Sequence, residues 1–110
     1  MVNRQNYRWV RSYLAHLSDH RQLDAKSVAC YWFYLRHLLL WAMERALSEA
    51  DRISPSFAVY LSNQRHSGQP LSAPTLKKII ATSQRLFHWL RANHLREFRH
   101  LPEAWNAPAN

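Results

Sequence analysis

A chain of 110 residues, 47% of them hydrophobic and five of them tryptophan, has the size and apolar content of one small domain with its own core. Its single glycine, Gly68, argues against a strand-rich fold, because tight turns between strands usually need glycine, asparagine or aspartate. Fifteen Lys and Arg against seven Asp and Glu give a formal charge of +8, which is unusual for a small-molecule enzyme and typical of modules that bind nucleic acid, although membrane-surface proteins share it.

Apolar residues at helical spacing predict two helices in the first half of the chain, over 3–18 and over 25–47, the second with Asp24 as its N-cap. The expected apolar stripe of the first helix is Tyr7, Val10, Leu14 and Leu17, with Tyr13 on its flank. The expected core face of the second is Val28, Tyr31, Leu35, Leu38, Leu39 and Ala42, broadened by Trp32, Phe33, Leu40 and Trp41. A helix that is apolar on most sides is either central in its bundle or uses a second face for a partner.

Two further helices are predicted in the second half. Ser54 and Pro55 open a third helix over 55–65, with Phe57, Tyr60 and Leu61 facing inward. The segment HSGQP at 66–70 reads as a turn, and Ser72 caps a fourth helix that runs to about residue 93. We therefore expect an all-α domain over 1–95, followed by a linker over 96–110.

The second and fourth helices each present a basic stripe without acids. On the fourth helix it consists of Lys77, Lys78, Thr82 and Arg85, and on the second of Lys26, Ser27, Cys30 and Arg36. Backbone N–H groups and the helix dipole in the first turn also favour phosphate near Lys26 and Ser27. The hydroxyls of Ser27 and Thr75 could bond phosphate, support their own helix starts, or do both. The alternative for either stripe is that it is only a solvent-exposed face that binds no ligand.

Other kinds of site have little support in the sequence. The lone Cys30 excludes an internal disulfide and a Cys-based zinc site, and no carboxylate or cysteine completes the pair His16 and His20, so we expect no metal and no cofactor. No acid/base pair or nucleophile constellation is visible. The longest apolar run, 38–43, is too short to span a bilayer and the N-terminus lacks a signal-peptide core, so we expect a cytoplasmic protein without a membrane partner.

Three segments resemble the core-binding domain of tyrosine recombinases, the family of phage integrases and Xer-type enzymes. In the first signature, LDAKSVACYWFYLRHLLLW, the matching residues are Leu23, Asp24, Ser27, Tyr31, Leu35, Leu38 and Trp41. In the second, LSAPTLKKIIATSQRLFHWL, they are Ser72, Thr75, Leu76, Ile80, Leu86, Phe87, Trp89 and Leu90. Between them RISPSFAVYL matches through Ile53, Pro55, Tyr60 and Leu61. Asp24 and Ser27 replace the family's usual Ser and Thr but keep the capping chemistry.

The resemblance implies a SAM-like, four-helix orthogonal bundle that clamps one face of double-stranded DNA, with the starts of the second and fourth helices at the major groove. The DNA-binding residues expected on this basis are Lys26, Ser27, Arg36, Thr75, Lys77, Lys78, Thr82 and Arg85. In this family the cleavage chemistry belongs to a separate C-terminal domain. We therefore assign no catalytic residue here, and expect that domain, reached through 96–110, and other protomers on DNA as further partners.

Two other functions remain open. The broad apolar surface with Trp32, Phe33 and Leu40 would suit a self-associating, SAM-like protein-interaction module. A small helix-turn-helix regulator is a third possibility, but it needs two short helices joined by a tight turn, and here the second helix is long and the loops are wide.

Overall fold

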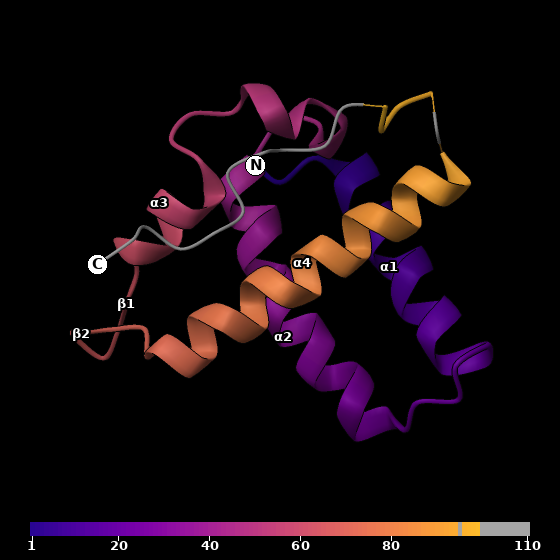
Figure 1. Ribbon diagram of the computed structural model, residues 1–110, viewed down its shortest axis with the longest axis horizontal. Coiled ribbons are helices and arrows are strands. Elements are labelled where there is room, and N and C mark those ends of the chain that lie inside the picture. The colour runs from indigo at the N-terminus through magenta and orange to yellow at the C-terminus, as the bar shows by residue number, and fades with distance from the viewer. Residues whose placement is uncertain (95, 100–110) are drawn as a thin grey trace.

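The computed structural model describes residues 1–94 and 96–99, which fold into an all-α bundle around one core, as predicted (Figure 1). The helices are α1 (Arg4–Asp19), α2 (Ala25–Ala42), α3 (Phe57–Ser62) and α4 (Ala73–Asn93), with a 3-10 helix, η1, at Leu47–Arg52. A hairpin of two very short strands, β1 (Arg65–His66) and β2 (Gln69–Pro70), occupies the predicted turn. The helix α2 contacts the other three, and α4 crosses α2 and α1 (Figure 1).

The helix α1 begins where the sequence predicts, and its buried face includes Trp9 but not the expected Tyr7. The other expected residues are buried, namely Val10, Tyr13, Leu14 and Leu17. Asn3 is the N-cap and accepts a hydrogen bond from the backbone N–H of Asn6 at 3.0 Å. Trp9 is 7% exposed and belongs to the core, whereas Tyr7 is 41% exposed and packs edge-on against Trp32. The prediction for Tyr7 was wrong because α1 is covered by both α2 and α4, which together bury a face that includes Trp9 and Tyr13.

The helix α2 ends at Ala42, not at Leu47 as predicted. Met43 has φ of 50°, a conformation that a helix cannot continue through, and the chain then turns into η1. No glycine or proline marks this end, so local propensity gives no signal for it.

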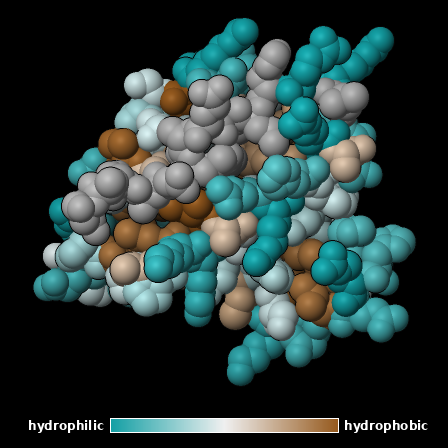
Figure 2. All heavy atoms as spheres, viewed as in Figure 1, coloured by the Kyte–Doolittle hydropathy of each residue, from teal (hydrophilic) through white to brown (hydrophobic). Residues whose placement is uncertain are grey.

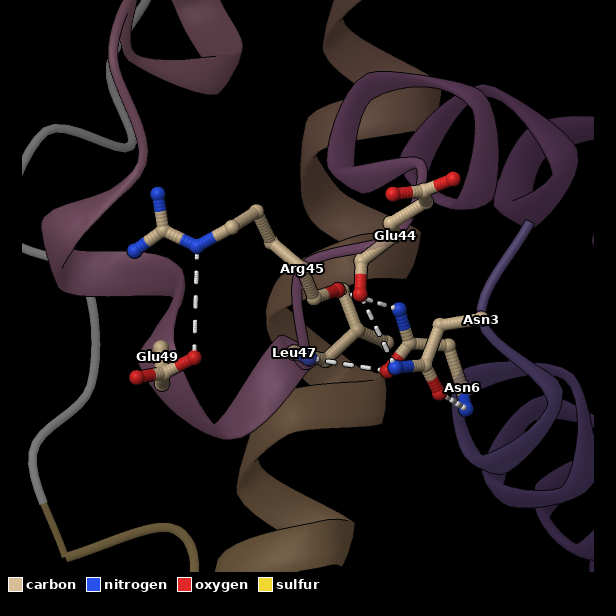
Figure 3. A network of polar contacts seen from close by, with 6 residues as sticks. All are labelled: Asn3, Asn6, Glu44, Arg45, Leu47 and Glu49. Carbon is tan, nitrogen blue, oxygen red and sulfur yellow. Dashed lines mark hydrogen bonds and ion pairs between the residues drawn. The ribbon is translucent and has the colours of Figure 1, made fainter. Parts of the chain in front are cut away.

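Hydrogen bonds from the start of α1 hold the turn after α2 (Figure 3). The backbone N–H of Asn3 donates to the carbonyl of Met43 at 2.7 Å, and its side-chain amide donates to the carbonyl of Glu44 at 3.1 Å. The fully buried amide of Asn6 donates to the carbonyl of Arg45 at 2.7 Å and accepts from the N–H of Leu47 at 2.8 Å. Groups far away in sequence thus satisfy backbone atoms that a longer helix would have paired internally.

The helix α3 is shorter than predicted at both ends. It begins after Ser56, whose hydroxyl accepts from the N–H of Val59 at 3.4 Å, so Ser56 and not Ser54 is the cap. The carbonyl of Pro55 instead accepts a hydrogen bond from the indole of Trp41 at 2.9 Å, which holds the segment before α3 outside the helix. Phe57 and Leu61 are buried and Tyr60 is half-buried, as expected.

The helix α4 follows its prediction closely. Ser72 is its N-cap and Pro74 lies in its first turn, and Ile79, Leu86 and Leu90 are 0% exposed. The hairpin before it turns through Ser67 and Gly68, with φ of 53° and 80°. Glycine adopts such angles without strain, which explains the position of the chain's single glycine.

The core extends into the segment that the sequence assigned to a linker. Phe98 is 1% exposed and packs at ring-centroid distances of 4.8 Å from Trp9 and 5.9 Å from Phe87. Its side chain therefore belongs to the helical unit, although the predicted boundary lay at residue 95. The remainder of the predicted linker, 100–110, lies outside the described residues.

Candidate nucleic-acid interface

The groove between α2 and α4, of about 510 Å³, collects five of the eight predicted DNA-binding residues. These five are Ser27 on α2 and Lys77, Lys78, Thr82 and Arg85 on α4. The α2 wall also carries Cys30, Tyr31 and Tyr34, and none of the described residues lining the groove is acidic. We call this the α2–α4 groove.

The basic side chains of the α2–α4 groove are free of acidic neighbours. Lys77, Lys78 and Arg85 are exposed, and the ion pairs found among residues 1–94 and 96–99 are those of the Met1 amino group with Glu44 and of Arg45 with Glu49. In the space-filling view, hydrophilic side chains alternate with hydrophobic ones on the face that α4 crosses (Figure 2). The positive charge of Lys77, Lys78 and Arg85 is therefore available to a ligand.

Thr82 does not lie on the exposed side of α4, and that prediction was wrong. Its side chain is 2% exposed, at the base of the α2–α4 groove. Thr82 is three residues after Ile79 and four before Leu86, so it shares the side of the helix that packs on the core. The expected contact face of α4 is consequently narrower and is formed by Lys77, Lys78 and Arg85.

The starts of α2 and α4 differ in charge. The carboxylate of Asp24 accepts a hydrogen bond from the N–H of Ser27 at 2.8 Å, and the backbone and hydroxyl donors of Ser27 lower the pKa of Asp24. The start of α2 therefore already holds an anion, which opposes a phosphate there. Lys26 is exposed beside it but does not line the groove.

The start of α4 is capped by a neutral group. The N–H of Thr75 donates to the Ser72 hydroxyl at 3.3 Å, and that hydroxyl donates to the Thr75 hydroxyl at 2.8 Å. Thr75 thus supports its own helix start, one of the two roles considered for it. Because no carboxylate caps α4, the partial positive charge of its N-terminus remains uncompensated.

A family model described as "Phage integrase, N-terminal SAM-like domain" matches residues 10–94, most of the chain. The chain belongs to this family. The match includes α2, α3 and α4 in full, and with them every residue of the α2–α4 groove. No curated protein and no solved structure matches the chain.

Two predicted residues of this SAM-like domain, Arg36 and Thr75, lie outside the groove and line a second cavity of about 510 Å³. Arg65 and His66 of the hairpin line it too, and neither was among the predicted DNA-binding residues. Because Arg65 and His66 lie at the turn over 66–70, the sequence indicated that basic side chains would project from this turn. Nothing in the sequence indicated that Arg36 of α2 would line the same cavity.

Tyr31 lies nearer the surface than the sequence predicts. It was expected on the core face of the second helix, yet it packs against the core only in part and lines the groove beside Tyr34, which is half-buried too. The helical spacing that puts Tyr31 toward the core also puts it at the edge of the buried face, so periodicity alone does not separate these positions.

Over residues 1–94 and 96–99, no group of three or more His, Cys, Asp or Glu side chains is placed to hold a metal ion, and the rings of His16 and His20 lie 5.2 Å apart. Within the same residues no helix combines the length and the hydropathy needed to cross a bilayer.

Proposed function

We propose that this SAM-like domain binds double-stranded DNA through the α2–α4 groove and docks on a recombination half-site. The observation that carries the proposal is the convergence of exposed Lys77, Lys78 and Arg85 on a groove without acids. Such side chains neutralise phosphates and release condensed counterions, which is the main source of sequence-independent affinity for DNA. Tyr31 and Tyr34 are half-buried residues of the same groove, and their hydroxyls supply additional donors that fix the register of the duplex.

The domain's role in recombination is to position chemistry that another domain performs. SAM-like N-terminal domains are non-catalytic parts of integrases, and the described groove offers cations and hydroxyls for binding DNA. The proposed partners are double-stranded DNA, a separate catalytic domain of the same protein, and other protomers on the DNA. The proposed location is cytoplasmic.

The test is a fluorescence-anisotropy titration of a labelled random-sequence duplex at low salt. The Lys77→Ala/Lys78→Ala variant should lose about tenfold or more in affinity, because two phosphate contacts are removed. Arg4→Ala/Arg8→Ala is the matched control, since it removes the same charge from exposed positions on α1 and should lose far less. Equal losses in the two variants would mean that net charge, and not the groove, determines binding.

Self-association is the second candidate function, and the exposed apolar side chains of α2 favour it. Phe33 and Leu40 are 43% and 45% exposed, which is unusual for large apolar residues of one helix face. Sedimentation velocity on the DNA-free protein separates the two functions. A stable oligomer that does not bind duplex DNA would favour this alternative, whereas a monomer that binds DNA would exclude it as the main role.

A further inference from the structure

The second cavity of about 510 Å³ lies between α2, the hairpin and the start of α4. It adjoins the α2–α4 groove, because Tyr34 lines the groove while His37, three residues further along the same face of α2, lines the cavity. On α4, Lys78 lines the groove and Thr75, three residues earlier on the same side of the helix, lines the cavity. A strand bound in the groove would therefore pass close to the mouth of this cavity.

One wall of the cavity is aromatic and accessible. The ring of Phe33 is 43% exposed, and the guanidinium carbon of Arg36 lies 5.1 Å from its centroid. The ring of His37 meets it edge-on at 5.7 Å. An exposed aromatic ring supported by a cation and a second ring is a surface on which a flat nucleobase can stack.

The other walls supply charge and hydrogen-bonding groups. Arg36 and Arg65 are exposed, and no acid is among the described residues that line the cavity. Arg65 is held in place through one nitrogen, which donates to the carbonyls of Gln64 at 3.0 Å and Ser62 at 3.4 Å, and its guanidinium has further donors. The side-chain amides of Gln64 and Gln69 can both donate and accept, as recognition of a base edge requires.

We propose that this cavity accepts one unpaired nucleotide of a DNA strand whose duplex is held in the α2–α4 groove. The base lies against Phe33 and its phosphate against Arg36 and Arg65. This inference rests on the proposed function, because the neighbouring duplex supplies most of the affinity. A base in an intact duplex is stacked on its neighbours and cannot enter, so the domain should prefer DNA with an extrahelical nucleotide near the groove.

The test compares the affinity of the full chain for a paired duplex and for a series of duplexes that each carry one bulged thymine at a successive position. At least one bulged duplex should bind about tenfold more tightly than the paired duplex, as stacking of one base predicts. Phe33→Ala should abolish this preference and leave binding to the paired duplex unchanged. Phe33→Tyr, which keeps the ring, should retain it, and Leu40→Ala controls for loss of an exposed apolar side chain from the same helix.

An abasic bulge at the preferred position separates stacking from flexibility, because it keeps the bend and removes the base. It should bind like the paired duplex. The proposal is overturned if no bulge is preferred, if the abasic bulge is equally preferred, or if Phe33→Ala keeps the preference. Binding to the paired duplex without any preference overturns this inference alone, whereas failure to bind any of the duplexes overturns the proposed function with it.

Discussion

The side-chain oxygen of Asn6 in α1 accepts a hydrogen bond from the backbone N–H of Leu47 at 2.8 Å, across 41 residues of sequence. The same side chain donates to the carbonyl of Arg45, so one buried amide replaces two backbone partners that α2 would otherwise have supplied. Asn6 therefore fixes the point at which the chain leaves α2, and through it the placement of η1.

Replacing Asn6 by alanine should destabilise the fold strongly. The change leaves the N–H of Leu47 and the carbonyl of Arg45 without their partner, and each such group costs about 1–3 kcal/mol when buried. Chemical denaturation should show a loss of roughly 3 kcal/mol in the free energy of unfolding. Asn93→Ala removes an exposed bond to the carbonyl of Trp89 and should cost far less. Equal losses of unfolding free energy in the two variants would show that the hydrogen bonds of Asn6 stabilise the fold no more than an exposed one does.

The end of α2 also shows where prediction from sequence succeeds and where it fails. The caps Asp24 and Ser72 act on residues three positions away, so they could be found from local pattern, and α4 was predicted almost to the residue. The end at Ala42 depends on Asn3 and Asn6, about forty positions away, and no local signal reports it. Helix starts in this chain are local features, whereas the end of α2 is a tertiary one.

In the candidate site, too, the features set by local sequence were predicted and those set by tertiary packing were not. Lys77, Lys78 and Arg85 were predicted together because they share one helix and its periodicity. Thr82 was misplaced because a polar residue on the border of the buried face has no distinguishing pattern. The second cavity could not be predicted, since it exists only once the hairpin lies next to α2.

Phe98→Ala should destabilise the domain although Phe98 follows the last helix. The ring is 1% exposed between Trp9 and Phe87, and truncation of a buried phenylalanine typically costs about 3–5 kcal/mol through lost contacts and the resulting cavity. The melting temperature should fall by several degrees or more. Phe33→Ala, at a phenylalanine that is 43% exposed, is the matched control and should change stability little. A melting temperature unaffected by Phe98→Ala would show that the core does not need this residue.

The salt dependence of DNA binding should report the number of groove contacts. Each phosphate neutralised contributes about 0.9 to the slope of log K against log salt, so Lys77→Ala/Lys78→Ala/Arg85→Ala should reduce the slope by roughly 2–3. Anisotropy titrations over a series of salt concentrations measure this slope directly. The Arg4→Ala/Arg8→Ala control should keep a slope near that of the original protein. A triple variant with reduced affinity but an unchanged slope would place these residues outside direct contact with phosphates.

His37 should make the domain less stable in mild acid. Burial, and secondarily the charge of Arg36, lower the pKa of His37 below its ordinary value of 6.5 in the folded protein. As the pH falls below about 6.5, the unfolded chain binds a proton at this imidazole before the folded protein does, so the free energy of unfolding decreases, and above that pH this residue has no effect. Chemical denaturation at pH values on both sides of 6.5 measures this effect. The free energy of unfolding of His37→Gln should decrease less in acid than that of the original protein. His88→Gln is the control, because it removes an imidazole from an exposed position on α4. If it reduces the acid-dependent loss of unfolding free energy as much as His37→Gln does, the burial of His37 is not the cause.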